Sequence, residues 1–330
     1  MGNPLILCDN LVKIYKVADL EVVALQGLDL EVAQGEMMAM VGVSGSGKST
    51  LLNILGGLDV PSAGRCIVDE NDLTHLSEAQ RLAYRRFIVG HLWQQTGRNL
   101  LPELSIQENI ELPQMLSGVS AAKRSQRAKD LLALVGLAGM EKKLPYQLSG
   151  GEQQRAGISV AIANNPKLLL ADEPTGELDS VTAGEILALL RSLNQQLGLT
   201  LILVTHDPAI AAAADRTIAI RDGRTSTETV RREAPLTSAH EYAPSASAVI
   251  ALPTETHHES ILIDRVGRLQ LPREAIESIS FNGRAEVLIL DDHVEIWPIG
   301  SLAQALADGY DPARRNSALV GEQRVQQEER

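Results

Sequence analysis

Residues 1 to about 224 alternate short apolar runs with helical stretches, whereas the chain after this point loses that regularity. The apolar runs Lys167–Ala171 and Leu199–Thr205 show no alternation with polar residues, which is typical of strands buried on both faces of a parallel sheet. Leu5–Leu11 and Leu28–Val32 have the pattern of strands in an N-terminal antiparallel portion. The pattern therefore predicts an α/β fold with a largely parallel core sheet.

Helical patterns fill the space between these runs. Glu36–Val41 is an apolar strand that enters a glycine-rich turn, and Ser49–Gly56 after the turn is predicted to be a helix. Ser120–Val135 is a basic amphipathic helix. It lies within a helical insertion that extends from about residue 96 to residue 148.

The C-terminal third of the chain differs in composition and in hydrophobic pattern. Residues 225–258 are rich in Ser, Thr, Ala, Pro and Glu without a sustained period, which predicts a linker. Residues 259–299 return to short alternating strands with a short helix near Arg273–Ser278, which predicts a second, smaller β-rich domain. Residues 300–330 are predicted to be a polar tail.

The turn after the predicted strand carries a phosphate-binding motif. The segment Gly42–Thr50 fits the pattern G-x-x-x-x-G-K-[ST], directly between a predicted strand and a predicted helix. Glycines let successive N–H groups face one anion, and the helix N-terminus favours negative charge. A Gly/Ser-rich loop without a ligand is the alternative, and the strand–loop–helix context argues against it. The predicted contacts to ATP and Mg²⁺ here are Gly42, Ser44, Gly45, Ser46, Gly47, Lys48, Ser49 and Thr50.

An apolar run ending in two acids predicts the hydrolytic centre. The strand beside the phosphate loop in a P-loop fold is expected to deliver an Asp to the Mg²⁺ shell, and Asp172 fits this role. Glu173 then lies one residue further on, where a carboxylate can orient or deprotonate the attacking water. An apolar run followed by Asp-Glu is common at strand ends, so its weight comes from the other motifs.

A third motif identifies a family. Leu148–Arg155 reads LSGGEQQR and precedes Asp172 at a distance that resembles the signature of ABC transporter ATPases. With the phosphate loop, it makes residues 1 to about 224 similar to that family. The resemblance implies a P-loop NTPase of ABC type, with a mixed sheet and a helical subdomain at about 96–148, followed here by a small C-terminal β-rich domain. It also implies an ATPase that turns ATP and water into ADP and phosphate.

The resemblance implies roles for residues outside the phosphate loop. Tyr15 matches the aromatic that stacks on adenine, although an ordinary core or surface tyrosine is the alternative. Gln94 matches the glutamine that touches Mg²⁺ or water, and Asp179 matches a residue that communicates between two sites. His206 matches the histidine that contacts the γ-phosphate. The signature residues implied to close over the ATP of a second protomer are Ser149, Gly150, Gly151 and Glu152. The implied catalytic residues are Glu173, His206, Lys48 and Gln94, and the implied Mg²⁺ ligands are Ser49, Gln94 and Asp172.

A finer resemblance concerns the transporter subgroup. Asn99–Ile110 resembles the lipoprotein-release and macrolide-export ATPases, the LolD/MacB-like group. This implies a separate integral-membrane permease of FtsX/MacB-like type and an export or mechanotransmission role. Departures from the family occur at His91 and Trp93, where Phe is more usual, and at Val160, where many relatives have Arg. Glu177 replaces a frequent Asn.

The C-terminal segment offers a rival function. Asp264–Glu274 and a later hairpin resemble the AbrB-type swapped-hairpin motif, which binds DNA in transcription factors. Residues 225–330 contain no Lys, 10 Arg and 17 Asp plus Glu, a net charge of −7, and a DNA-binding face normally has a basic excess. We therefore expect a dimerisation domain at residues 259–299 and no nucleic acid. A soluble ABC ATPase with a DNA-linked or regulatory role stays the alternative, and a nucleotide-sensing scaffold is disfavoured.

Composition agrees with a location inside the cell. The net charge of the whole chain is −12, and its two cysteines, Cys8 and Cys66, have no metal-binding spacing. The sequence shows no signal peptide and no window of about 20 apolar residues that would span a bilayer. We expect a homodimer, held by an ATP sandwich and by the C-terminal domain, that is cytoplasmic and peripheral on the inner face of the cell membrane.

Overall fold

The computed structural model describes residues 4–17, 20–232, 256–263, 267, 269–271, 273–279, 285–290 and 294–307. The chain forms two compact units, Met1–Gln270 and Leu271–Arg330. The sequence pattern changes after about residue 224. The boundary between the two units lies further along the chain, near residue 270.

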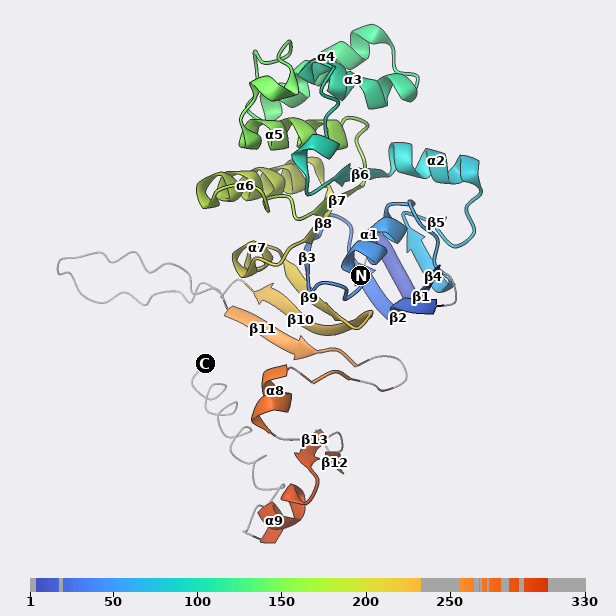
Figure 1. Ribbon diagram of the computed structural model, residues 1–330, viewed down its shortest axis with the longest axis vertical. Coiled ribbons are helices and arrows are strands. Elements are labelled where there is room, and N and C mark those ends of the chain that lie inside the picture. Colours follow the sequence, from blue (N-terminus) through green and yellow to red (C-terminus); the bar gives the residue numbers. More distant parts are fainter. Residues whose placement is uncertain are drawn as a thin grey trace, which may run out of the picture. The chain divides into compact units, whose positions relative to one another are not determined.

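The first unit is built around a seven-stranded sheet in the order β11-β10-β9-β3-β8-β7-β6 (Figure 1). Strands β9, β3, β8, β7 and β6 pair in parallel with one another, and β10 and β11 are added antiparallel at one edge. The largely parallel core expected from the unalternating apolar runs is confirmed. The strands are β3 (Met37–Val41), β6 (Val89–Leu92), β7 (Leu168–Asp172), β8 (Thr200–Val204), β9 (Arg216–Arg221), β10 (Arg224–Arg232) and β11 (Thr256–Ile261).

A four-stranded antiparallel sheet in the order β2-β1-β4-β5 forms the N-terminal portion. Its first two strands are longer than the sequence pattern predicts, because each continues past its apolar end to the hairpin that joins them. The strands are β1 (Ile6–Val17), β2 (Leu20–Val32), β4 (Ala63–Val68) and β5 (Asn71–Asp72).

Helices α3, α4 and α5 gather at one end of the first unit, as Figure 1 shows. Ser105 caps α3 and Ser149 caps α5, each by exchanging hydrogen bonds with a glutamate three residues later. Among the described residues, no helix is long and apolar enough to span a membrane. The helices of the first unit are α1 (Lys48–Leu55), α2 (Glu78–Phe87), α3 (Ile106–Leu116), α4 (Ala121–Leu134), α5 (Gly150–Ala161), α6 (Ser180–Leu197) and α7 (Pro208–Ala212), with 3₁₀ turns at Thr96–Arg98 and Pro145–Gln147.

The seven-stranded sheet separates two apolar cores. Along β3, Met37 and Ala39 join the core under the helical end, whereas Met38 and Met40 join the core that contains α1 and the antiparallel sheet. Successive side chains of a strand point to opposite faces, so a strand covered on both sides must be apolar throughout. This is the physical reason for the unalternating runs in the sequence.

The strand order explains how Asp172 comes near the phosphate loop. Strand β8 lies between β3 and β7, and all three strands are parallel. The carboxyl ends of all three parallel strands therefore meet at one edge of the sheet. His206, which follows β8, lies between the two halves of the site for this reason.

The predicted linker at residues 225–258 does not begin as a linker. Residues 224–232 form β10, which pairs with β9 from Arg224 to Val230, and residues 256–261 form β11, which pairs with β10. This part of the prediction is wrong because β10 is rich in polar residues and so lacks the apolar pattern of the central strands. Residues 233–255 lie outside the described residues. The first part of the expected domain at 259–299 thus belongs to the first unit.

The second unit contains a hairpin and two short helices. Its elements are α8 (Arg273–Ser278), β12 (Ala285–Ile289), β13 (Val294–Pro298) and α9 (Ser301–Ala307). Strands β12 and β13 pair antiparallel, as expected for the last hairpin of this segment. Helix α9 begins the segment predicted to be a polar tail, and residues 308–330 lie outside the described residues.

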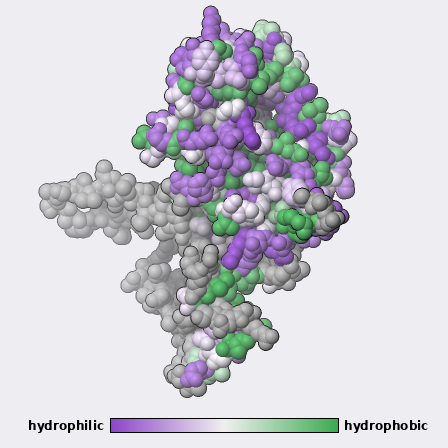
Figure 2. Space-filling model, in the orientation of Figure 1, coloured by the Kyte–Doolittle hydropathy of each residue, from purple (hydrophilic) through white to green (hydrophobic). Residues whose placement is uncertain are grey.

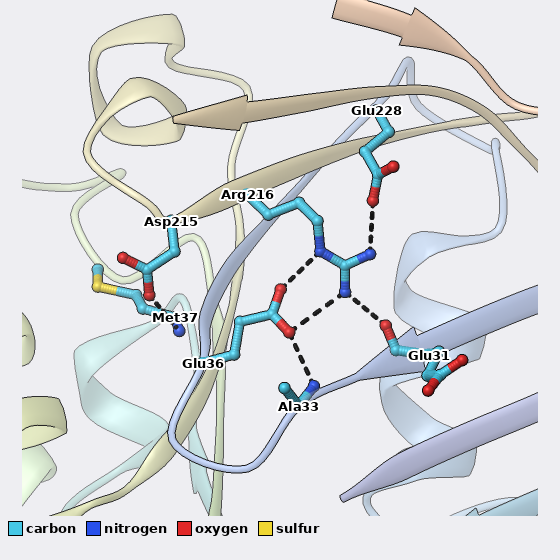
Figure 3. A network of polar contacts seen from close by, with 7 residues as sticks. All are labelled: Glu31, Ala33, Glu36, Met37, Asp215, Arg216 and Glu228. Atoms are coloured by element: carbon cyan, nitrogen blue, oxygen red, sulfur yellow. Dashed lines mark hydrogen bonds and ion pairs between the residues drawn. The ribbon is translucent and has the colours of Figure 1, made fainter. Parts of the chain in front are cut away.

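An ionic network holds β10 to the rest of the first unit (Figure 3). The guanidinium group of Arg216 on β9 donates to both carboxylate oxygens of Glu36, at 2.6 and 3.3 Å, and to Glu228 on β10 at 2.6 Å. It also donates to the carbonyl oxygen of Glu31. Burial disfavours the charged form of Arg216, yet its bonds to the two glutamates outweigh that cost and raise its pKa.

Candidate functional site

The phosphate loop connects β3 to α1. Two of its glycines, Gly42 and Gly47, have backbone conformations that other residues adopt only with strain. Gly42 has φ 152° and Gly47 has φ 106°. A Cβ at Gly42 would lie 2.3 Å from the carbonyl oxygen of Ile220, and one at Gly47 would lie 2.6 Å from that of Ala24. Gly47 also provides no side-chain cap to α1. The first N–H groups of this helix are therefore available to an anion.

Lys48 spans the interior of the loop. Its ammonium group donates to the carbonyl oxygens of Gly42 at 2.8 Å and Val43 at 2.9 Å. Burial lowers the pKa of Lys48, and the charges of Glu173 and Asp172 oppose that shift. An ammonium group held inside a loop of backbone donors has the charge and position to bind phosphate oxygens.

Glu173 follows β7 in an unusual backbone conformation. Its φ is 46°, in the left-handed region that residues other than glycine seldom adopt, and its N–H donates to the carbonyl oxygen of Val204 at 2.9 Å. The amide of Gln94 donates to one of its carboxylate oxygens at 3.0 Å, and Nδ1 of His206 lies 3.1 Å from the other. Residues far apart in the sequence thus fix both oxygens of this carboxylate.

Asp172 lines the same pocket as Glu173. Burial and the neighbouring charge of Glu173 raise its pKa, and the charge of Lys48 counters them in part. Ser49, Gln94 and Asp172 all line one pocket of about 490 Å³. Hydroxyl, amide and carboxylate oxygens are the donors that Mg²⁺ prefers, so these three residues fit the ion that the sequence implies.

The pocket also contains residues that the sequence analysis missed. Val22, Val23 and Ala24 of β2 line it beside the loop, and Val22 and Val23 are exposed at 53% and 45%. Tyr15, predicted to stack on adenine, is the register partner of Val22 but is absent from the pocket wall. Its hydroxyl donates to Asp59 at 2.7 Å. The exposure of these valines and their place beside the loop are visible only in the structure. The adenine contact of Tyr15 stays a prediction.

Gly223, a second residue that the sequence does not predict, is hydrogen-bonded to the phosphate loop. The N–H of Gly223, in the turn between β9 and β10, donates to the carbonyl oxygen of Ser46 at 3.0 Å. Gly223 has φ 71°, and a Cβ there would lie 2.6 Å from the carbonyl oxygen of Ala24. The Asp222-Gly223 pair in the sequence marks this turn, but nothing in the sequence places it against the phosphate loop.

Gly223→Ala is expected to raise the dissociation constant for ATP about tenfold, because strain of 1–2 kcal/mol displaces the loop that Gly223 supports. Gly198→Ala is the matched control, since Gly198 has φ 63° but no atom within 4 Å of its Cβ position. Titration with a fluorescent ATP analogue measures both variants. Equal affinities in the two variants would mean that the contact behind the loop has no role in binding.

The signature residues lie apart from this pocket. Ser149 caps α5: its N–H and hydroxyl donate to Glu152 at 2.7 and 2.8 Å, which lowers the pKa of Glu152. A Cβ at Gly151 would lie 2.5 Å from a methyl group of Thr182. The pocket wall includes none of Ser149, Gly150, Gly151 and Glu152. Within one copy of the chain, the signature residues therefore do not line the pocket of the phosphate loop.

Asp179 also lies outside the pocket wall and caps α6. Its carboxylate accepts from the N–H groups of Val181 and Thr182 and from the hydroxyl of Thr182 at 2.7 Å, so its pKa is lowered. A link to the hydrolytic loop comes instead from Gln154 on α5, which donates to the carbonyl oxygen of Pro174 at 2.6 Å. The signature helix is therefore tied to the loop that follows Glu173.

Known proteins match this arrangement. The family model described as ABC transporter matches residues 25–176. An uncharacterized ABC transporter ATP-binding protein of Thermotoga maritima is 45% identical over 212 residues, which are 64% of this chain and 89% of that protein. The macrolide export ATP-binding/permease protein MacB of Brucella melitensis is 43% identical over 232 residues, which are 70% of this chain. The chain matches only 35% of the length of that MacB protein.

A solved structure agrees with the sequence matches. The dimeric ATP-binding cassette MJ0796, bound to ADP and Pi in a post-hydrolysis state, superposes with a TM-score of 0.62 at 38% identity. The match covers 68% of this chain and 97% of the other. These relatives support no DNA-linked role, and the AbrB-like interpretation of the C-terminal segment stays a prediction. The chain therefore belongs to the ABC transporter family, as an ATP-binding cassette that binds ATP with Mg²⁺ and hydrolyses it.

Proposed function

We propose that this chain is the ATP-hydrolysing subunit of an ABC transporter of MacB-like export or mechanotransmission type. The observation that carries the proposal is the carboxylate of Glu173, held between Gln94 at 3.0 Å and His206 at 3.1 Å at the edge of the phosphate pocket. In this proposal the subunit acts as a homodimer and lies against the inner face of the cell membrane, bound to an integral-membrane permease.

Each residue of the site has a chemical role in this proposal. Glu173 orients the attacking water and accepts its proton, while Gln94 and His206 keep the carboxylate aimed at that water. Lys48 offsets negative charge on the phosphate oxygens. Ser49, Asp172 and Gln94 would hold Mg²⁺, which when bound neutralises charge on the transferred phosphoryl group.

The homodimer follows from the separation of the signature from the pocket. Ser149 caps the N-terminus of α5, which favours an anion, yet Ser149 is absent from the wall of the pocket in its own copy. A second copy can supply this helix end to the ATP bound by the first copy. The dimeric MJ0796 cassette, which this chain resembles over 97% of that chain's length, supports the same arrangement.

The permease has a candidate docking surface on the cassette. A pocket of about 350 Å³ is lined by α2, β6, α3 and α5, with Leu116 exposed at 60% and Leu82 at 48% on its rim. His91 and Val160, two departures from the usual family residues, both line it. His91 stacks on Trp93, with ring centroids 5.1 Å apart, and Gln94 follows directly. We propose that a cytoplasmic segment of the permease occupies this pocket and is sensed through that stack.

The test is recovery of a permease with the tagged chain from gently solubilised membranes. Glu173→Gln with ATP is expected to retain one multi-span membrane protein, identified by mass spectrometry, because the dimer cannot hydrolyse its ATP. Adding Leu116→Asp is expected to lose that protein without changing the ATP affinity, since a buried unpaired charge opposes docking. Leu197→Asp, at an apolar site exposed at 45% outside the pocket, is the control. Recovery only from the soluble fraction, with DNA or ribosomes, would contradict the transport role.

The C-terminal unit is part of the same proposal. We propose that it holds two cassettes together, whereas its AbrB-like relationship and the FtsX/MacB-like type of the permease rest on sequence resemblance alone.

A further inference from the structure

Gln154 on α5 is a polar residue inside the first unit. Much of the face of this unit seen in Figure 2 is hydrophilic, and polar side chains there can bind water, whereas Gln154 is only 1% exposed. Its Nε2 donates to the carbonyl oxygen of Pro174 at 2.6 Å, and its Oε1 is buried with no hydrogen-bond partner among the described residues. A carbonyl oxygen only accepts, so the amide nitrogen must be the atom that faces Pro174. A buried acceptor without a partner costs free energy, so the bond to Pro174 is what distinguishes glutamine from an apolar residue here.

This bond lies one residue beyond Glu173. Pro174 follows Glu173 directly, and both Pro174 and Thr175 are buried, so the start of the loop is packed inside the protein. The loop also turns back on itself, since the N–H of Gly176 donates to the carbonyl oxygen of Glu173 at 3.1 Å. A shift of the Pro174 carbonyl group therefore moves the backbone that carries the Glu173 carboxylate.

The backbone of Glu173 depends on support from its neighbours. Its φ of 46° is in the left-handed region, a conformation that persists in such a residue only where surrounding contacts hold it. Before the side chain, the N–H of Glu173 donates to Val204 at 2.9 Å. After it, the carbonyl group of Pro174 accepts from Gln154. These two bonds fix the chain on both sides of the strained residue.

Helix α5 contacts the same loop at a second point. A Cβ at Gly150, one turn before Gln154, would lie 3.5 Å from Cδ2 of Leu178. Residues four apart lie on one face of a helix, so Gly150 and Gln154 both face this loop. The donor to Pro174 is thus carried by a helix that is itself packed against the loop, which gives the amide a fixed position.

We propose that Gln154 is a positioning residue for hydrolysis, which aims the Glu173 carboxylate by holding the carbonyl group of Pro174. Gln154 is absent from the wall of the phosphate pocket, so its effect on the reaction passes through Glu173. This inference rests on the proposed role of Glu173 as the base. Proton transfer needs the carboxylate within hydrogen-bonding reach of the attacking water, and a displacement of about 1 Å can lower a rate about 100-fold.

Gln154→Met keeps the approximate length and volume of the side chain and removes the donor. We expect kcat for ATP hydrolysis by the full chain to fall about 10–100-fold, while the dissociation constant for ATP stays the same. The urea midpoint of unfolding is expected to change little, because the variant removes the unpaired Oε1 together with the donor to Pro174. A role in stability alone would instead lower the midpoint and leave kcat per folded molecule unchanged.

Gln114→Met on α3 is the matched control. Gln114 is 3% exposed and donates to the carbonyl oxygen of Ile110 at 3.0 Å, but it is absent from the wall of the phosphate pocket. The control therefore makes the same substitution at a buried glutamine that also binds a backbone carbonyl group. We expect its kcat to stay close to that of the natural chain.

A double variant tests whether Gln154 acts through Glu173. In the Glu173→Gln background, Gln154→Met is expected to change the residual rate less than about twofold, because the base that it positions is already absent. Single turnover of radiolabelled ATP measures all four rates. Equal fold losses in the two backgrounds, or a natural kcat in Gln154→Met, would overturn the inference. Normal turnover in Glu173→Gln would contradict the proposed role of Glu173 itself, so the two failures give different results.

Discussion

Glu173→Gln is expected to lower the rate of ATP hydrolysis by about 10²–10⁴-fold while ATP binding is retained. The amide has the shape of the carboxylate but cannot accept a proton from the attacking water. Its oxygen can still accept from Gln94, which lies 3.0 Å from Glu173 in the natural chain. Release of phosphate at saturating ATP measures the rate, and titration with a fluorescent ATP analogue measures the affinity.

Glu177→Gln is the matched control for this substitution. Glu177 lies in the same loop, four residues further along the chain, but outside the wall of the phosphate pocket. The control therefore removes an identical charge without removing the base, and we expect hydrolysis close to that of the natural chain. Normal turnover in Glu173→Gln would remove Glu173 from the chemistry. Loss of ATP affinity in the same variant would assign it a role in binding instead.

The local motifs could be predicted from the sequence because each is contiguous. Gly42–Thr50 combines a strand, a glycine-rich turn and a helix start, and every part of it lies where the sequence places it. Ser149 could be expected at a helix start because Glu152 follows three residues later. Such features depend on a few neighbouring residues, and tertiary structure does not alter them.

Contacts between distant segments could not be predicted in the same way. The insertion of β8 between β3 and β7 is a property of strand order, which periodicity does not encode. Gly223 supports the phosphate loop only because the β9–β10 turn lies behind it. Tyr15 matches a motif position, yet its hydroxyl is bound to Asp59, a residue that the sequence alone does not bring near. Strands β10 and β11 could not be predicted because polar strands lack a hydrophobic period.

Arg216→Ala is expected to lower the free energy of unfolding of the first unit by about 3 kcal/mol. The side chain of Arg216 is 19% exposed and binds Glu36 and Glu228, whose side chains are 13% and 24% exposed. Its loss leaves two carboxylates close together and shielded from water, without their shared cation. Glu36 also accepts from the N–H of Ala33 at 2.8 Å, so the turn before β3 loses support as well. Urea denaturation followed by circular dichroism measures the effect.

Arg221→Ala on the same strand separates this effect from the loss of any arginine. The side chain of Arg221 is 40% exposed and lies 3.8 Å from Asp222, itself 74% exposed, and a surface pair of this kind contributes at most about 1 kcal/mol. Amide hydrogen exchange adds a local measurement: in Arg216→Ala the N–H groups of β10 should exchange faster than those of β8, because Glu228 is the side chain that fixes β10 to β9. Equal losses of stability in the two variants, with β10 still protected, would show that backbone pairing alone holds this strand. Strands β10 and β11 would then be held to the first unit without a contribution from the ion pairs of Arg216.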